Sequence, residues 1–214
     1  KLAQENARYL ISVFMPTQMI YTTSFRQINY IASWMLHYRD NVNLHDEFEV
    51  KLAGSMHHFV SELNRLNLLE YGLLQNEKER KISLFSDDVD KVDEHFGYAY
   101  STTYKASYAC LAQEQRHRTL DYQMKRLDKK EFFVPPIILD DETLTNEWLD
   151  DMKVVSKYNP QGELVLISET GKYDNFILKC KERLCSAAQL EIMLNTRETL
   201  LKYRDALKES NHYL

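Results

Sequence analysis

The sequence is poor in glycine, with 5 glycines in 214 residues, and it lacks the loops that usually hold nucleotide phosphates. It contains neither a G-x-G-x-x-G nor a Walker-type sequence, in which glycine lets the backbone approach a phosphate. It also shows no Ser-His-Asp order with a nucleophile elbow. These absences exclude the commonest nucleotide loops, so a ligand of this chain is not held by the usual glycine loops.

Cysteine is also scarce, and no apolar run approaches the roughly 20 residues that span a bilayer. The three cysteines, Cys110, Cys180 and Cys185, are odd in number and lack metal-site spacing. The polar start, Lys-Leu-Ala-Gln-Glu-Asn-Ala-Arg, shows no signal segment, and since it lacks an initiator Met we expect a piece of a longer protein. We expect reduced thiols, a cytoplasmic location, no membrane partner and no metal site.

The sequence also has no excess of basic residues over acidic ones, since the net charge is −5 and the pI is near 5.8. General nucleic-acid binders are usually basic, so we expect no nucleic-acid partner. A basic pocket that binds a single nucleotide is still compatible with this net charge, because the local electric field guides a small ligand. The composition is otherwise ordinary for a globular protein, at a length that fits one large or two small domains.

Apolar spacing predicts a helical first part. Helices are expected over residues 2–11, from the N-cap Ser24 to about Tyr38, and from about His45 to Asn67. The last of these is expected to turn inward Phe48, Leu52, Met56, Phe59, Val60 and Leu63. Charge-rich segments then mark a composition shift, so we place a module boundary near residue 75 and divide the chain into 1–75 and 76–214.

The second part mixes strand-like and helical patterns. Strands are expected at Ile82–Phe85, Phe96–Tyr104, Thr119–Met124 and Glu163–Ser168. Helices are expected at Lys105–Glu114, from a Thr145 cap to about Lys157, and at residues 172–184 and 186–209 with little or no break. The expected fold class is therefore α+β, helix-rich, with long helices packed beside a mixed sheet.

A weak internal repeat links the two parts. His45–Val50 resembles Ala187–Ile192, and each follows a helix and an arginine, Arg39 or Arg183. Taken alone, two ordinary amphipathic helices explain this similarity better.

One basic stretch stands out: Arg116-His117-Arg118, with Gln113 three residues before it. Arginine keeps its charge in proteins, and its planar fork of donors matches phosphate and carboxylate oxygens. If a helix continues to Arg116, Gln113 shares its face and could supply an amide to a base edge. The alternative is a solvated basic turn, which is what short charge runs usually are.

These residues resemble the signatures of flavin-dependent thymidylate synthases (ThyX). The family segment E-H … Q-x-x-R-H-R is matched by Glu94-His95, Gln113 and Arg116-His117-Arg118. The signature A-R-x-x-L-P-x-x-x-x-T-x-x-x-x-T-x-N-x-R is matched by Ala7-Arg8, Leu10, Thr17, Thr22 and Arg26, with Ser24 in place of Asn. The signature L-R-x-x-x-x-A-Q-x-E-I is matched by the ten residues from Arg183 to Ile192.

The order of the signatures is unusual for a single synthase, in which the Arg-His-Arg segment comes first. Here a C-terminal half, 1–75, precedes a fuller and divergent second copy, 76–214. The resemblance therefore implies a tandem pair of ThyX-like modules. The second copy also departs from the family, since the serines and the Asn-Glu expected after Arg118 are replaced by Asp121, Gln123, Met124 and Arg126.

The resemblance implies an FAD-dependent enzyme that methylates dUMP to dTMP, with methylenetetrahydrofolate and NADPH as co-substrates. It further implies a homo-oligomer whose sites combine residues of two modules. By this resemblance Arg183 is catalytic, Arg116, His117, Arg118 and His95 bind the cofactor, and Gln113, Arg8 and Arg26 bind dUMP or a related nucleotide. The departures leave two alternatives: a degenerate nucleotide- or flavin-binding or scaffold protein, and a helical interaction domain.

Overall fold

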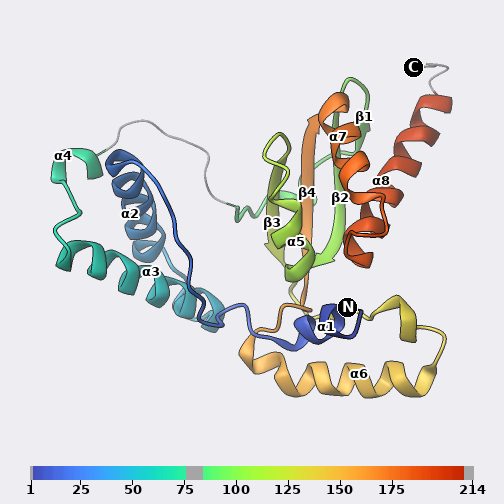
Figure 1. The fold of residues 1–214 in the computed structure, drawn as a ribbon, viewed down its shortest axis with the longest axis horizontal. Helices are drawn as coiled ribbons and strands as arrows, with labels where there is room; N and C mark the ends of the chain where they lie inside the picture. The colour runs from blue at the N-terminus through green and yellow to red at the C-terminus, as the bar shows by residue number, and fades with distance from the viewer. Residues whose placement is uncertain (1, 76–83, 210–214) are drawn as a thin grey trace. The chain divides into compact units, whose positions relative to one another are not determined.

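The structure is a computed structural model that describes residues 2–75 and 84–209. The chain divides into two compact units (Figure 1): a helical unit, residues 16–75, and a sheet unit, residues 2–15 and 84–209. Residues 2–15 thus belong with the sheet, although the helical unit follows them in the sequence. The predicted halves 1–75 and 76–214 concern ancestry, and that division stays a prediction.

Four strands form one sheet in the order β1-β2-β4-β3. Their bounds are β1 His95–Phe96, β2 Ala99–Ser107, β3 Asp121–Arg126 and β4 Leu164–Lys172. The predicted α+β class is confirmed, but the predicted mixed sheet is wrong, because every neighbouring pair of strands is antiparallel. The strands β2 and β3 run the same way, yet β4 lies between them and runs opposite to both.

The predicted strand Ile82–Phe85 falls partly outside the described residues, which resume at residue 84. Within the described part, Phe85 forms an isolated parallel bridge to Met124 of β3. This bridge extends the β3 edge by one contact and adds no further strand.

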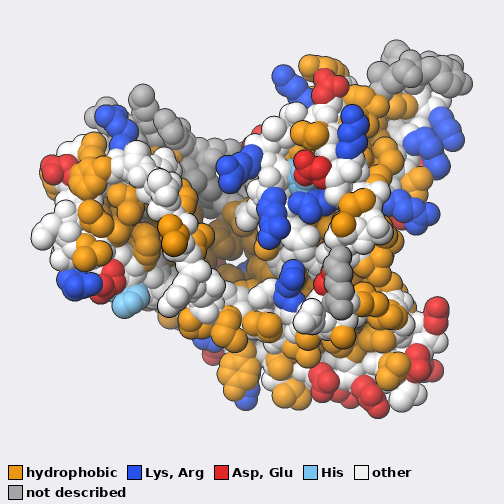
Figure 2. Space-filling view, in the orientation of Figure 1, with side chains coloured by type: hydrophobic (Ala, Val, Ile, Leu, Met, Phe, Trp, Pro, Cys, Tyr) orange, Lys and Arg blue, Asp and Glu red, His pale blue; other side chains and the backbone are white. Residues whose placement is uncertain are grey.

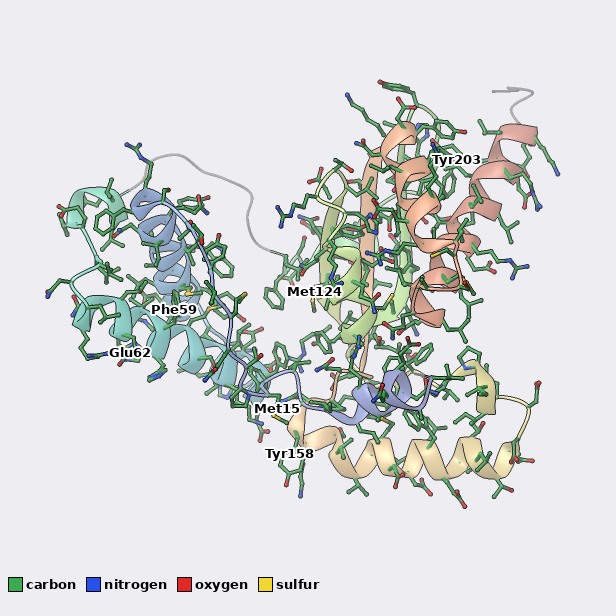
Figure 3. All side chains as sticks on the ribbon, in the orientation of Figure 1. Met15, Phe59, Glu62, Met124, Tyr158 and Tyr203 are labelled. Carbon is green, nitrogen blue, oxygen red and sulfur yellow. The ribbon has the colours of Figure 1, made fainter. Side chains whose placement is uncertain are left out.

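Helices cover one face of the sheet because one side of the strand alternation is apolar. The register places Ala106 of β2 beside Val165 of β4, and Met124 of β3 beside Ile167 of β4. These four buried residues pack with side chains of α5 (Tyr108–Glu114) and α8 (Leu190–Glu209). Figure 3 labels Met124 within this packing.

A second core cluster lies toward the other end of the same face. Tyr203 of α8 stacks on Phe176 of α7 (Tyr173–Arg183), with ring centroids 5.7 Å apart. Tyr100 of β2 packs against both rings. The hydroxyl of Tyr203, labelled in Figure 3, donates to the carbonyl of Gly97. The helices α7 and α8 are therefore fixed on the sheet through aromatic rings.

The N-terminal segment completes the sheet unit. The helix α1 (Leu2–Ala7) continues into a 3-10 turn, η1 (Arg8–Leu10), and the buried Tyr9 lies in that turn. The Tyr9 ring lies 4.7 Å from Phe133 and 6.4 Å from Trp148 of α6 (Glu142–Val155), centroid to centroid. Three further 3-10 turns are η2 Val89–Lys91, η3 Pro136–Ile138 and η4 Ser156–Tyr158.

The helical unit contains α2 (Phe25–Asp40), α3 (Glu47–Arg65) and the short α4 (Tyr71–Leu74). Its core holds Ala32 of α2 against Val60 and Leu63 of α3. The buried Asn29 ties α2 to the segment before α4: its Nδ2 donates to the carbonyl of Leu68, and its Oδ1 accepts from the backbone N–H of Glu70.

Several sequence predictions agree with these elements. Ser24 caps α2 and accepts a hydrogen bond from the Gln27 N–H, as predicted. On α3, Phe48, Met56, Val60 and Leu63 are buried, whereas Phe59 is 42% exposed, so its inward placement is wrong. Helical spacing alone does not decide this exposure, because Phe59 lies three residues after the buried Met56 and four before the buried Leu63.

Three predicted boundaries are wrong. The strand β2 runs through Ser107, because Lys105 and Ala106 pair with Leu166 and Val165, so the following helix begins only at Tyr108. The helix α6 begins three residues before Thr145, since Asp141 caps it by accepting from the Leu144 N–H. A turn over residues 184–189 separates α7 from α8.

Across the described ranges, 2–75 and 84–209, none of the helices is both long enough and apolar enough to cross a bilayer.

Candidate functional site at the junction of α5 and α7

The Arg-His-Arg segment lies just after α5, where two tight turns redirect the chain toward β3. Ser107 starts α5 by accepting from the Cys110 N–H. At the other end, the N–H of Arg116 donates to the Gln113 carbonyl and the N–H of His117 donates to the Glu114 carbonyl. These turns place the His117 side chain inward, where it is 7% exposed, and leave its two arginine neighbours outside.

His117 and Arg183 are in direct contact. The Arg183 Nε donates to Nε2 of His117 at 2.7 Å, although the residues are 66 positions apart. An accepting Nε2 requires the imidazole proton on Nδ1, which faces the Glu182 carboxylate at 3.6 Å. Burial, followed by the positive charge of Arg183, lowers the pKa of His117 below its usual value. The imidazole is therefore neutral near pH 7, and the positive charge at this contact belongs to Arg183.

A second contact joins the same two segments. The side-chain amide of Gln113 donates to Oε1 of Gln189, which lies just before α8. The amide of Gln189 in turn donates to the hydroxyl of Tyr9 at 2.5 Å. All three side chains are buried. The segments that carry the three family-like signatures therefore meet through Gln113, Gln189 and Tyr9.

Glu191 anchors this chain of contacts. Its carboxylate accepts from the Ser107 N–H at 2.8 Å, from the Ser107 hydroxyl at 2.6 Å and from the Tyr9 hydroxyl at 2.9 Å. Burial raises the pKa of Glu191, while the hydrogen bonds from Ser107 oppose that effect. Burial and the Glu191 charge also raise the pKa of Tyr9, so the tyrosine stays protonated and donates. Glu191 of α8 is thus bonded to η1 through Tyr9 and to the N-cap of α5 through Ser107.

Arg116 and Arg118 are exposed on the turn that precedes β3. Figure 2 shows Lys and Arg side chains gathered over β3 and α5, whereas acidic side chains lie along α6. The carbonyl of Thr119 accepts from Asn175 of α7 at 2.9 Å, which fixes the end of the turn. Each of these exposed guanidinium groups can bind an anion through two parallel N–H bonds.

The other predicted site residues lie elsewhere. His95 is exposed on β1, the edge strand opposite to β3, with two inner strands between them. Arg8 is exposed in the 3-10 turn beside Tyr9 and so belongs to the sheet unit. Arg26 is exposed in the first turn of α2 and belongs to the helical unit. The structure thus brings together Gln113, His117 and Arg183, with Arg116 and Arg118 on the adjoining turn.

The sequence did not reveal a buried ionic cluster directly beneath this site. Lys179 Nζ lies 2.5 Å from Oε2 of Glu114 and 2.6 Å from Oε2 of Glu169. None of these three side chains is more than 1% exposed. Burial works against the charge on Lys179, but the two carboxylates outweigh it and raise its pKa.

Periodicity could have located this cluster. Glu169 follows Val165 and Ile167 at two-residue spacing on β4, so alternation alone places its side chain on the covered face of the sheet. Lys179 lies three residues after Phe176 on α7 and therefore shares its buried face. A charged residue on an apolar face needs a partner of opposite charge, and Glu169 and Lys179 are such partners for each other.

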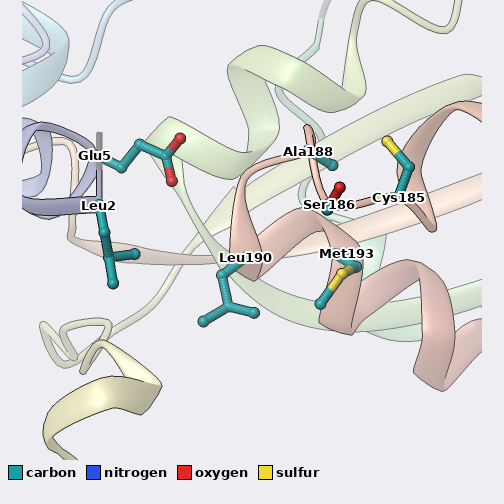
Figure 4. Close-up of a pocket in the computed structure, with 7 residues that line it drawn as sticks. All are labelled: Leu2, Glu5, Cys185, Ser186, Ala188, Leu190 and Met193. Atoms are coloured by element: carbon teal, nitrogen blue, oxygen red, sulfur yellow. The ribbon is translucent and has the colours of Figure 1, made fainter.

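A cavity of about 340 Å³ opens beside the segment that links α7 to α8. Figure 4 shows its lining, which is mostly apolar and comprises Leu2, Glu5, Cys185, Ser186, Ala188, Leu190 and Met193. Its size is at the lower end of small-molecule sites. Because Ala188 adjoins Gln189 and Cys185 lies two residues after Arg183, the cavity borders the candidate site.

The donor set suits anion binding better than nucleophilic catalysis. Arg183 and the exposed Arg116 and Arg118 supply fixed positive charge, whereas burial raises the pKa of the Cys110 thiol well above its usual value. Within the described residues, no group of three or more His, Cys, Asp or Glu side chains could hold a metal ion.

A scan against protein-family models finds no family that matches this chain, and a search of curated proteins finds no significant match.

Proposed function

We propose that this chain is a flavin-dependent thymidylate-synthase-like protein that binds FAD and a uridine nucleotide and methylates dUMP to dTMP. The observation that supports the proposal is that the first residues of one signature segment, around Tyr9, meet the other two signature segments in the sheet unit. Tyr9, beside Arg8, contacts Gln189 and Glu191, Gln113 contacts Gln189, and His117 contacts Arg183. Hydrogen bonds thus connect segments that are up to 182 positions apart, and residues of a shared ligand site would need such a connection.

The residues of the turn fit the anionic part of FAD. Arg116 and Arg118 present two exposed guanidinium groups that match the oxygens of a diphosphate. The mostly apolar cavity beside Ala188 suits a flat ring. When bound and reduced by NADPH, the flavin supplies the electrons that convert a methylene group into a methyl group.

Arg183 is the residue we expect to act on the nucleotide. Its Nε is held by His117, so the orientation of the guanidinium plane is set before a ligand arrives. A preorganised positive charge stabilises negative charge that develops on a uracil ring, where it forms. We expect a homo-oligomer or a second module to complete the site, since Arg26 lies in the other unit.

The test is to purify the protein and measure flavin absorbance, FAD binding by calorimetry and dTMP formation. The paired variant Arg116→Ala/Arg118→Ala should lose FAD binding, whereas the exposed Arg197→Ala on α8 should bind like the wild type. An absence of bound flavin in the wild type, even after FAD is added, would overturn the proposal.

A second candidate is a degenerate relative that binds the ligand without turnover. The observation that favours it is the stretch after Arg118, where the resemblance calls for serines and Asn-Glu. Asp121 is exposed at the start of β3 and would repel a phosphate, and Met124 is buried in the core. Calorimetric titration with FAD and dUMP, together with a tritium-release assay, separates the candidates: binding without tritium release supports the second.

A further inference from the structure

The buried cluster of Glu114, Glu169 and Lys179 carries an unequal number of charges. Two carboxylates face one ammonium group, so full ionisation leaves a net charge of −1 in the core. An uncompensated charge at such a depth is costly, and a buried acid commonly keeps its proton instead. The hydrogen bonds indicate which of the two acids holds it.

Glu169 is the carboxylate with the closer set of hydrogen-bond donors. Its Oε1 accepts from the Tyr100 hydroxyl at 2.5 Å, and its Oε2 accepts from the Tyr104 hydroxyl at 2.6 Å and from Lys179. Burial and the neighbouring carboxylates raise the pKa of both tyrosines, so they stay protonated as donors. Three short hydrogen bonds therefore reach the two oxygens of Glu169.

Glu114 also has three donors, but two of them are more distant than any donor to Glu169. Its Oε2 accepts from Lys179 and, at 3.2 Å, from the Tyr122 hydroxyl. In the described part of the chain, the partner of its Oε1 is the Cys110 thiol at 3.9 Å, a weak donor. Burial is the main cause that raises the pKa of Glu114 to about 7, and Glu169 adds to it while Lys179 opposes it.

The groups that face Glu114 come from every element packed around it. They are Lys179 on α7, Glu169 on β4, Tyr100 and Tyr104 on β2, Tyr122 on β3, and Cys110 on α5. From α8, Asn195 donates to Cys110, and Glu191 is already engaged by Ser107 and Tyr9. None of these neighbours therefore adds a second positive charge to the cluster.

The cluster also lies directly behind the candidate site. Glu114 follows Gln113, and its carbonyl accepts the N–H of His117 at 2.9 Å. Lys179 lies one turn before Arg183 on the same face of α7. The Glu114–Lys179 contact thus ties together the two backbone segments whose side chains form the His117–Arg183 pair.

We propose that Glu114 stores a proton near neutral pH, and that loss of this proton weakens anion binding by Arg116, Arg118 and Arg183. The lost proton places a second negative charge beside Glu169, which repels that carboxylate and lowers the positive potential of the turn. Glu114 and Lys179 act here as positioning residues. The effect on FAD rests on the proposed function, whereas the stored proton does not.

The experiment has a ligand-free arm. Infrared difference spectra between about pH 6 and about pH 8, one unit on either side of the pKa of about 7, should show a carboxylic-acid band that disappears as the pH rises. Glu114→Gln should lack this band, and the exposed Glu198→Gln on α8 should keep it. A wild-type protein without a titrating acid band, or a band that persists in Glu114→Gln, overturns the stored proton.

The second arm measures the affinities for FAD and for sulfate, whose charge is constant in this range, at the same two pH values. The wild type should lose at least about fivefold in affinity at the higher pH, the lower end of typical coupling between sites. Glu114→Gln, which resembles the protonated acid, should lose less affinity at the higher pH. The pH dependence that remains in this variant comes from other groups such as His117.

The outcomes separate the two proposals. If sulfate binding shows the pH effect while FAD does not bind, the proposed function fails and the present inference stands. If FAD binds with the same affinity at both pH values in the wild type, the inference fails, whether or not Glu114→Gln folds. Equal pH dependence in the wild type and in a folded Glu114→Gln also overturns it.

Discussion

The Arg183 side chain donates through Nε to Nε2 of His117 at 2.7 Å, and this bond decides how the basic segment works. It holds His117 as a neutral imidazole, so the central residue of Arg-His-Arg is an orienting acceptor and not a third positive charge. The cations of the site are then Arg116, Arg118 and Arg183. A ligand that needs three positive charges therefore meets residues from two separate segments of the chain.

The first prediction concerns this bond. His117→Leu removes the acceptor and leaves the half-buried Arg183 without its partner, which we expect to destabilise the sheet unit by about 1–3 kcal/mol. His117→Gln keeps a side-chain oxygen near the same place and should recover much of that loss. Urea unfolding followed by circular dichroism measures both. Equal stability of His117→Leu and the wild type would contradict the assigned bond.

The second prediction concerns pH and stability. The pKa of Glu114 is raised from 4.5 to about 7, so the folded chain keeps a proton that the unfolded chain has already released in that range. The stability from this group is complete below about pH 4.5 and is lost as the pH rises through about 7, in all by about 3 kcal/mol.

Two other buried groups contribute to the measured curve. Glu191, whose pKa is also raised, acts in the same sense as Glu114. His117, whose pKa is lowered, acts in the opposite sense below its usual value, because the folded chain then binds fewer protons than the unfolded chain. The difference in unfolding free energy between the wild type and Glu114→Gln should isolate Glu114. A difference that is constant between about pH 5 and 8 would show that Glu114 titrates normally.

The third prediction compares two glycines. A Cβ on Gly162 would lie 2.8 Å from Met152 Cε, 2.9 Å from Tyr9 Cβ and 3.1 Å from the Tyr9 carbonyl oxygen. Gly162→Ala should therefore destabilise the chain by about 1–3 kcal/mol, since the Tyr9 backbone cannot move without disturbing Glu191. Gly54 on α3 has open space around the same position, so Gly54→Ala should stabilise by about 0.5–1 kcal/mol. Thermal unfolding of both variants checks the opposite signs.

The fourth prediction concerns the thiols. Cys185 is exposed at the rim of the cavity, whereas Cys110 and Cys180 are buried. Burial also raises the pKa of Cys180 to about 11, so little thiolate forms there. A small thiol reagent should label Cys185 quickly in the native protein and the other two only after unfolding. Native labelling of Cys185→Ser at the wild-type rate would contradict this assignment.

The fold class and part of the candidate site could be predicted from the sequence. Helix and strand periodicities are local, so α2, α3, α7 and α8 were recognisable from spacing. The family resemblance named Gln113, His117 and Arg183 as site residues, but the contacts of Gln113 and His117 with the segment from Arg183 were not predicted. The strand end at Ser107 was missed, because the pairing of Ala106 with Val165 is a contact between distant segments.

Glu114 and Tyr9 show why local patterns did not reveal the remainder of the site. Glu114 follows Gln113 in a segment that resembles a polar helix end, and nothing local indicates that Lys179, 65 positions later, removes it from water. Tyr9 lies in a segment that was predicted only as part of a helix over residues 2–11, whereas its hydroxyl bonds to Gln189 and Glu191. Such partners are set by the packing of the sheet unit, and pattern reading within a short window does not include them.

The contacts of Tyr9 determine where the chain can be truncated. A fragment that begins near residue 76 would keep the whole sheet but lose the tyrosine that bonds to Glu191 and Gln189, together with the Leu2 and Glu5 wall of the cavity. The helical unit interrupts the sheet unit, so the cleaner dissection is excision: a linker that joins residue 15 to residue 84 keeps the N-terminal segment in the same chain as the sheet.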